Sequence, residues 1–132
     1  MNLEYIIQLG AVAELASLGW PRKRLRVELG EFDAACLDSE GRPEVLMEAK
    51  ARVAGPDGLA SLLRKWLVLG EADAVTRGEN AANKYLELLR ITEEKPQVEV
   101  LLVAAGARWW LTARRDGPYR LTFRTSRALT PS

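Results

Sequence analysis

Two acidic side chains and a lysine lie in a short stretch whose pattern predicts a β-hairpin. Asp33, Glu48 and Lys50 belong to residues 30–52, where two apolar runs flank a turn signal at Glu40-Gly41. Carboxylate oxygens are the ligands that Mg²⁺ and Mn²⁺ prefer, and an ammonium group beside them can contact a phosphate or a water molecule. These three residues therefore form a candidate metal site for hydrolytic chemistry.

The position of the turn decides which side chains of the hairpin meet. With Glu40 and Gly41 at the tip, Ser39 pairs with Arg42 and Asp33 lies directly opposite Glu48. Side chains paired in this way have Cβ atoms about 4.5–5.5 Å apart. Because side chains alternate between the faces of a strand, Lys50 shares the face of both acids.

The arrangement of Asp33 and Glu48-Ala49-Lys50 resembles the motif of the PD-(D/E)XK nuclease superfamily, an Asp on one strand and Glu-x-Lys on the next. The neighbouring residues, GEFD and MEAKAR, are similar to the GE-x-D…VEVK-x-R pattern of the YraN-like bacterial family and of archaeal Holliday-junction resolvases. The resemblance covers roughly residues 8–52 and fades beyond them.

This resemblance implies metal-dependent hydrolysis of DNA phosphodiester bonds, with endonuclease or exonuclease action left open. Asp33 and Glu48 would hold Mg²⁺ or Mn²⁺, with the main-chain carbonyl of Ala49 as a further ligand. Lys50 would orient or deprotonate the attacking water and stabilise the pentacovalent phosphorus. Glu31, which matches the glutamate of GE-x-D, would extend the site.

The first helix departs from the family pattern. Families of this type often carry a catalytic or metal-orienting Glu there, and alignment on Gly19-Trp20 puts Gln8 at that position. Glutamine can hydrogen-bond a metal-bound water, but it supplies no charge. The alternatives to an active enzyme are therefore a nuclease-like module that binds nucleic acid or protein without cutting, and a subunit that needs a partner chain.

Basic side chains are the candidates for contacting DNA. They would bind backbone phosphates without reading the base sequence, and a plain solvated surface is the alternative interpretation. By the resemblance, a homodimer would present two cleavage sites. The candidate residues are Arg22, Lys23, Arg24, Arg26, Arg52, Arg64 and Lys65.

Composition excludes several classes of protein. The chain has 132 residues, a net charge of +1 and no histidine, which removes Ser-His-Asp hydrolases and most zinc sites. The single cysteine, Cys36, lies in an apolar context and is expected in the core. No apolar run approaches the roughly 18 residues that span a bilayer, so we expect a cytoplasmic protein without a membrane partner.

The elements that position these residues follow from hydrophobic periodicity. Helices are expected at 3–18, capped by Asn2, at 59–69, capped by Asp57, and at 79–91; strands are expected at 25–29, in the hairpin, at 98–104, and in a C-terminal hairpin of 108–113 and 119–124. Together with the resemblance, this order predicts a single domain over residues 1–132. Its fold would be α/β, a three-layer α/β/α restriction-endonuclease-like fold with a central mixed sheet.

Both faces of the central hairpin are largely apolar, so helices should cover both. One face carries Asp33 and Glu48, and the other is expected to carry Phe32 and Cys36. Trp20 is expected to cap the core, with stacking on a nucleic-acid base as the alternative. The adjacent residues Trp109 and Trp110 point to opposite faces, so one should be buried and the other exposed or at an interface.

Overall fold

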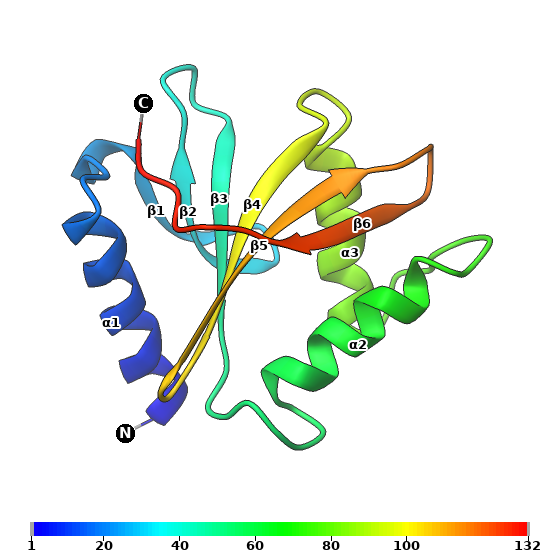
Figure 1. The fold of residues 1–132 in the computed structure, drawn as a ribbon, viewed down its shortest axis with the longest axis horizontal. Coiled ribbons are helices and arrows are strands. Elements are labelled where there is room, and N and C mark those ends of the chain that lie inside the picture. The colour runs from blue at the N-terminus through cyan, green and yellow to red at the C-terminus, as the bar shows by residue number, and fades with distance from the viewer. Residues whose placement is uncertain (1, 132) are drawn as a thin grey trace.

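The computed structural model describes residues 2–131, which form one six-stranded sheet and three α-helices (Figure 1). The elements follow one another in the predicted order. They are α1 (Leu3–Ser17), a short 3₁₀ helix (Arg22–Arg24), β1 (Leu25–Leu29), β2 (Phe32–Leu37), β3 (Pro43–Ala49), α2 (Leu59–Leu69), α3 (Asn80–Ile91), β4 (Gln97–Ala104), β5 (Ala107–Arg115) and β6 (Leu121–Thr125).

The strands lie in the sheet in the same order as in the chain, from β1 to β6. Strands β3 and β4 are parallel, and all other neighbours are antiparallel, so the sheet is mixed. Helices α2 and α3 form the crossover between the two parallel strands, and β5 and β6 form the C-terminal hairpin. The central position predicted for residues 98–104 is confirmed, because β4 lies between β3 and β5.

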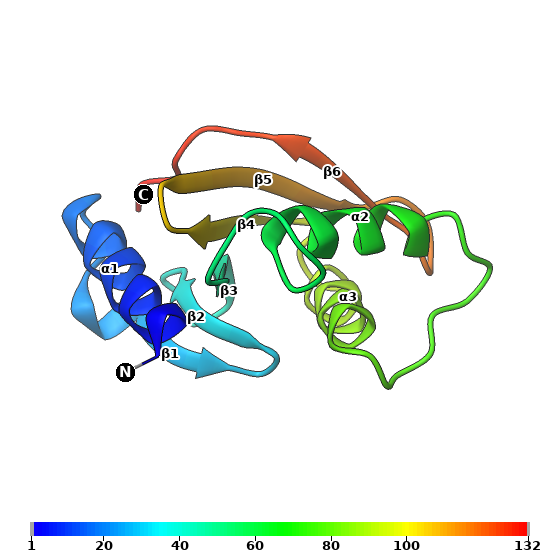
Figure 2. The same ribbon diagram turned by 90° about the horizontal axis from the view of Figure 1, so that it is seen from below.

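Helices cover both faces of the sheet, as the apolar hairpin predicts. Figure 2 shows α1 on one side of the strands and α2 with α3 on the other. Two separate hydrophobic clusters result. The cluster under α1 contains Ala11 and Leu15 of that helix with Cys36 and Met47 of the hairpin, and the larger cluster is centred on Trp66 and Tyr85.

Two expected core residues are confirmed. The Trp20 side chain is 2% exposed, and its Nε1–H donates to the Leu129 carbonyl at 3.0 Å, which rules out stacking on a base. Cys36 is buried, and burial, with a smaller contribution from the Glu44 carboxylate, raises the pKa of its thiol to about 12. The thiol is therefore protonated and unreactive at neutral pH.

Three aromatic residues differ from expectation. Phe32 packs in the cluster under α2, with its ring centroid 6.4 Å from that of Trp66, instead of sharing the face of Cys36. Phe32 directly follows a tight turn in which Gly30 has a φ of 57°, so strand alternation is not yet established there. Trp109 and Trp110 do point to opposite faces, but both are half-buried.

The tip of the central hairpin also differs from the predicted two-residue turn. The Asp38 N–H donates to the Arg42 carbonyl at 2.7 Å, so the loop is longer than Glu40-Gly41. Asp38 Oδ1 accepts the N–H groups of Glu40 and Arg42, each at 2.9 Å, and organises the loop. These backbone hydrogen bonds are the main reason that the pKa of Asp38 is lowered.

The predicted register of the hairpin is nevertheless confirmed. An irregularity between Cys36 and Leu37 shifts the pairing by one residue and offsets the longer loop. Beyond it, Ala34 pairs with Met47 and Ala35 with Leu46, as the shorter turn would require.

One of the two predicted helix caps is confirmed, and the other is wrong. Asn2 caps α1, and its Oδ1 accepts the Glu4 N–H at 2.9 Å. Helix α2 is capped by Gly58 instead of Asp57, and no side chain caps it. A Cβ at Gly58 would lie 2.3 Å from the Val53 carbonyl oxygen, so the close approach of the loop requires glycine. No helix in residues 2–131 is long and apolar enough to cross a membrane.

We expect Gly58→Ala to lower the free energy of unfolding by about 1–3 kcal/mol, because the added methyl group meets backbone atoms that cannot rotate away. Gly10→Ala is the matched control. Gly10 lies within α1 with nothing within 4 Å of its Cβ position, so alanine there should stabilise by about 0.5–1 kcal/mol. Urea unfolding measures the change in the free energy of unfolding for each variant. Equal changes in the two variants would contradict the steric explanation.

Candidate active site

The hairpin brings Asp33, Glu48 and Lys50 together at the carboxyl end of β3, at the bottom of the sheet in Figure 1. Asp33 Oδ2 accepts the Ala49 N–H at 2.8 Å, which holds the carboxylate against the next strand. Lys50 Nζ lies 3.4 Å from Glu48 Oε2. Lys50 follows the last residue of β3, and its N–H donates to the Val103 carbonyl at 2.9 Å.

A second lysine, which sequence reasoning missed, completes this group. Lys84 Nζ lies 3.3 Å from Glu48 Oε2 and 2.6 Å from Asn80 Oδ1. Lys84 is only 4% exposed, because it lies on the buried face of α3, where its side chain reaches Glu48. Its position in the sequence carried a signal, since Lys84 follows Ala81 and precedes Leu88 at the helical spacing of the apolar face. A lysine on such a face requires a buried partner.

Glu48 is the most unusual carboxylate of the group. Its side chain is 3% exposed, and Oε1 is buried without a hydrogen-bond partner among the described residues. Burial raises the pKa of Glu48 to about 7, with a further contribution from Asp33, while Lys84 and Lys50 act in the opposite direction. Removal from water thus outweighs the attraction of the two ammonium groups.

The donor set fits a hard divalent cation. Glu48 Oε1 offers a buried anionic oxygen without a partner, and the carboxylate of Asp33 is close enough to act on the pKa of Glu48. In residues 2–131, no three His, Cys, Asp or Glu side chains gather to hold a metal. The protein would therefore supply two carboxylates and the Ala49 carbonyl, with water completing the shell, as Mg²⁺ commonly requires.

Glu31 and Gln8 lie near this group but make other contacts. Glu31 Oε1 lies 3.3 Å from Arg77 Nη2, in the loop between α2 and α3, and Glu31 does not gather with Asp33 and Glu48. Gln8 Nε2 donates to the main-chain oxygen of Asp33 at 3.2 Å. Gln8 therefore contacts the backbone of β2 from α1, on the sheet face opposite the carboxylates.

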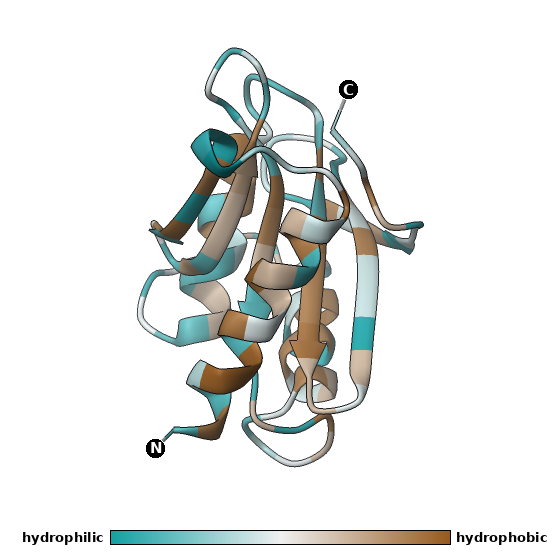
Figure 3. Cartoon of the chain, turned by 90° about the vertical axis from the view of Figure 1, so that its left-hand side faces the viewer, coloured by the Kyte–Doolittle hydropathy of each residue, from teal (hydrophilic) through white to brown (hydrophobic). Residues whose placement is uncertain are grey.

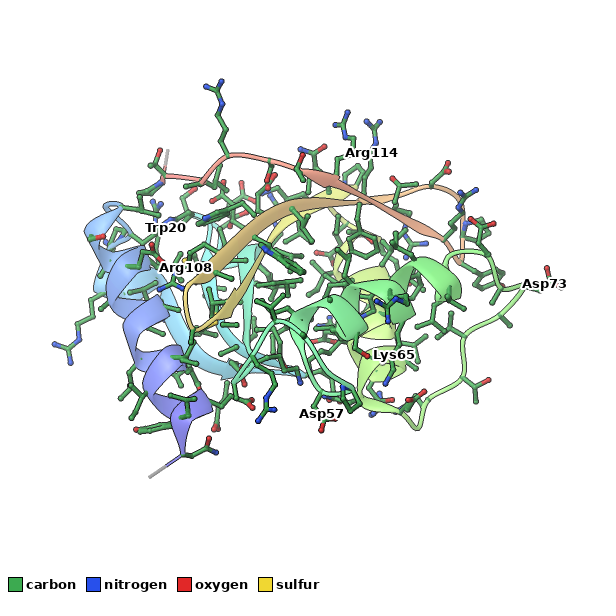
Figure 4. All side chains as sticks on the ribbon, turned by 60° about the horizontal axis from the view of Figure 1, so that its bottom comes forward. Trp20, Asp57, Lys65, Asp73, Arg108 and Arg114 are labelled. Atoms are coloured by element: carbon green, nitrogen blue, oxygen red, sulfur yellow. The ribbon has the colours of Figure 1, made fainter. Side chains whose placement is uncertain are left out.

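Part of the predicted DNA-binding set lies beside the site. Lys50 and Lys65 border an open pocket of about 70 Å³, together with Ser61 and Asn80. Figure 4 shows Lys65 of α2 on the same side of the molecule as Asp57, which also lines this pocket. Lys65 pairs with Glu79 at 3.2 Å. Arg52 and Arg64, also in this region of the chain, are exposed.

The basic run of residues 22–26 lies at the other end of the sheet. Leu25 pairs with Cys36, so this run adjoins the hairpin loop and not the carboxyl end of β3. Lys23, Arg24 and Arg26 border a separate hollow of about 390 Å³ with Asp38. The structure therefore divides the predicted DNA-binding residues between two ends of the molecule.

The chain matched no protein-family model, no curated protein and no solved structure in the comparisons. Its function is therefore inferred from the motif and from the geometry of the site.

Proposed function

We propose that the chain is a metal-dependent nuclease that hydrolyses DNA phosphodiester bonds and has a restriction-endonuclease-like fold. The observation that carries this proposal is the Glu48 carboxylate, buried beside Asp33 with one unpartnered oxygen and with Lys50 Nζ at 3.4 Å. A carboxylate oxygen that is buried without a partner is costly, and such perturbed groups gather at sites that bind a ligand or perform chemistry. The mixed sheet with helices on both faces is consistent with this fold.

Each residue of the group has a role in this proposal. A bound Mg²⁺ or Mn²⁺ would supply an activated water and offset charge on the scissile phosphate. Asp33 and Glu48 would hold the cation, and the hydrogen bond from Ala49 N–H orients the Asp33 carboxylate. Lys50 orients the water and donates to the phosphate oxygens as negative charge develops on them.

The pocket next to Lys50 supports a phosphate-containing substrate. Lysine, serine and asparagine side chains border it, and all three can donate hydrogen bonds to phosphate oxygens. Such contacts bind the DNA backbone and carry no base preference.

The direct test is isothermal titration of Mn²⁺ into the wild type and into Asp33→Asn. We expect binding to the wild type and at least about 10-fold weaker binding to the variant, because one of two anionic ligands is lost. Asp73→Asn is the matched control, since Asp73 is exposed in the loop between α2 and α3 and projects away from the site (Figure 4). Wild-type binding would justify cleavage assays on branched and linear DNA.

One observation favours the alternative, a nuclease-like module that binds without cutting. Lys50 and Lys84 both pair with Glu48, and the Asp33 carboxylate accepts the Ala49 N–H, so the group has partners within the protein even without metal. If the wild type binds no Mn²⁺ with or without DNA, this alternative replaces the enzyme. Retained DNA binding in a mobility-shift assay would then identify nucleic acid as the ligand.

This alternative also has a surface available for a protein partner. Figure 3, which looks onto α1, shows hydrophobic residues in that helix near its amino end. Leu3, Ile6 and Leu9 are each about half exposed there. Sedimentation of the purified chain would establish whether a second copy covers this surface.

A further inference from the structure

Lys84 makes a contact that the nuclease motif does not include. Its Nζ lies 3.3 Å from Glu48 Oε2, the same oxygen that Lys50 approaches to 3.4 Å. The side chains of Lys84 and Glu48 are 4% and 3% exposed. Because water screens such a pair weakly, the ammonium group of Lys84 acts strongly on the candidate metal ligand.

We infer that Lys84 is an internal counter-ion, which neutralises Glu48 in the metal-free protein and leaves that carboxylate when a divalent cation binds. The inference rests on the proposed function, because it concerns the same carboxylate. It adds a regulatory residue from α3 that sets the affinity of the site for metal.

Charge is the first argument for this role. With both carboxylates ionised, Asp33 and Glu48 carry two negative charges that Lys50 and Lys84 balance, so the metal-free group is neutral. A cation bound to Glu48 would lie about 2.0–2.1 Å from its oxygen if it is Mg²⁺, and therefore close to any ammonium still paired with that carboxylate. The repulsion between them weakens metal binding unless the ammonium moves.

The surroundings of the two lysines indicate which one moves. Asn80 Oδ1 accepts from Lys84 Nζ at 2.6 Å, so Lys84 keeps a buried partner after it leaves Glu48. Lys50 has no second acceptor of this kind among the described residues, but it borders the open pocket and is 15% exposed. Lys50 is therefore placed to contact substrate, and Lys84 is placed to move between Glu48 and Asn80.

The test compares Mn²⁺ affinity in Lys84→Met and Lys95→Met by isothermal titration at pH 8. Both variants lose one positive charge, but Lys95 lies 3.9 Å from Asp38 near the hairpin loop and does not contact Glu48. We expect Lys84→Met to bind Mn²⁺ at least about 10-fold more tightly than the wild type, because a buried like charge is removed. Lys95→Met should stay within about 2-fold of the wild type, since its charge lies at the other end of the sheet and is screened by solvent.

The outcomes separate this inference from the proposed function. Binding to Lys84→Met when the wild type binds weakly or not at all supports the inference. Equal affinities for the wild type and Lys84→Met, or weaker binding to a folded Lys84→Met, would overturn it while leaving the metal site in place. Absence of binding to the wild type and to a folded Lys84→Met would overturn both the inference and the nuclease.

A second measurement needs no variant and covers the case in which Lys84→Met fails to fold. A crystal structure of the wild type soaked with Mg²⁺ should show Lys84 Nζ on Asn80 Oδ1 and away from Glu48. If the metal binds while Lys84 Nζ remains 3.3 Å from Glu48 Oε2, the distance in the metal-free protein, Lys84 is not displaced and the inference is wrong. A soaked crystal without metal at Glu48 would also count against it.

Discussion

Replacing Lys50 by alanine is expected to reduce DNA cleavage by about 10²–10⁴-fold while Mn²⁺ binding is retained. This magnitude is typical for removal of a group that moves a proton or stabilises charge in a transition state. The metal should still bind, because Lys50 is not one of its proposed ligands and its ammonium lies 3.4 Å from Glu48 Oε2, beside the open pocket.

The control for this experiment is Lys95→Ala. Lys95 lies 3.9 Å from Asp38 near the hairpin loop, at the other end of the sheet, and the variant carries the same change in net charge. Cleavage by Lys95→Ala should match that of the wild type. A similar loss in both lysine variants would mean that overall charge, and not the position of Lys50, controls the reaction. Full cleavage by Lys50→Ala would remove the assigned catalytic role.

The second large effect concerns stability and pH in metal-free buffer. Relative to Glu48→Gln, the wild type should lose roughly 3 kcal/mol of unfolding free energy as the pH rises from about 4.5 to about 7. Burial raises the pKa of Glu48 from 4.5 to about 7 in the folded protein. Between these values the folded chain holds a proton that the unfolded chain has released, so stability is highest at low pH and falls until Glu48 is ionised.

Glutamine is the appropriate reference because it keeps the shape of the side chain and cannot titrate. Urea unfolding at pH 5, 6, 7 and 8 with a chelator gives the difference between the two proteins at each pH. Asp38 does not interfere, because its pKa is lowered from 3.8 and its titration lies below this range. Parallel curves for the two proteins would show that Lys50 and Lys84 keep Glu48 ionised throughout.

Local patterns predicted most of the elements. Helix α2 occupies Leu59–Leu69 and β1 occupies Leu25–Leu29, as hydrophobic periodicity indicated. Such patterns are informative because the spacing of buried side chains along an element is set by the backbone geometry of that element alone. The position of Asp33 beside the end of β3 was predicted from a two-residue turn that is wrong in detail. The register is nevertheless the predicted one, because a shift of one residue would move every buried side chain of the hairpin to the other face.

Details of turns and caps were less predictable. The longer loop at Asp38 and the irregularity after Cys36 shift the pairing of β2 with β3 in opposite directions, so the register is unchanged. Neither feature has an unambiguous signal in the sequence. Gly58 caps α2 because the backbone of Val53 approaches too closely for any side chain, which is a contact between segments and not a preference of either one. Phe32 faces the helices of the crossover because a turn precedes it.

The sequence by itself determined the order of the elements, because each one follows from its own hydrophobic period. It also determined the central hairpin and the meeting of Asp33, Glu48 and Lys50, because these depend on neighbours within one strand pair. Only the tertiary structure decided that Lys84 reaches Glu48 and that the basic run of residues 22–26 lies far from it. Those relations depend on how the buried face of α3 meets β3 and on where β1 joins the sheet. Contacts between elements distant in the chain leave no periodic pattern, so packing alone establishes them.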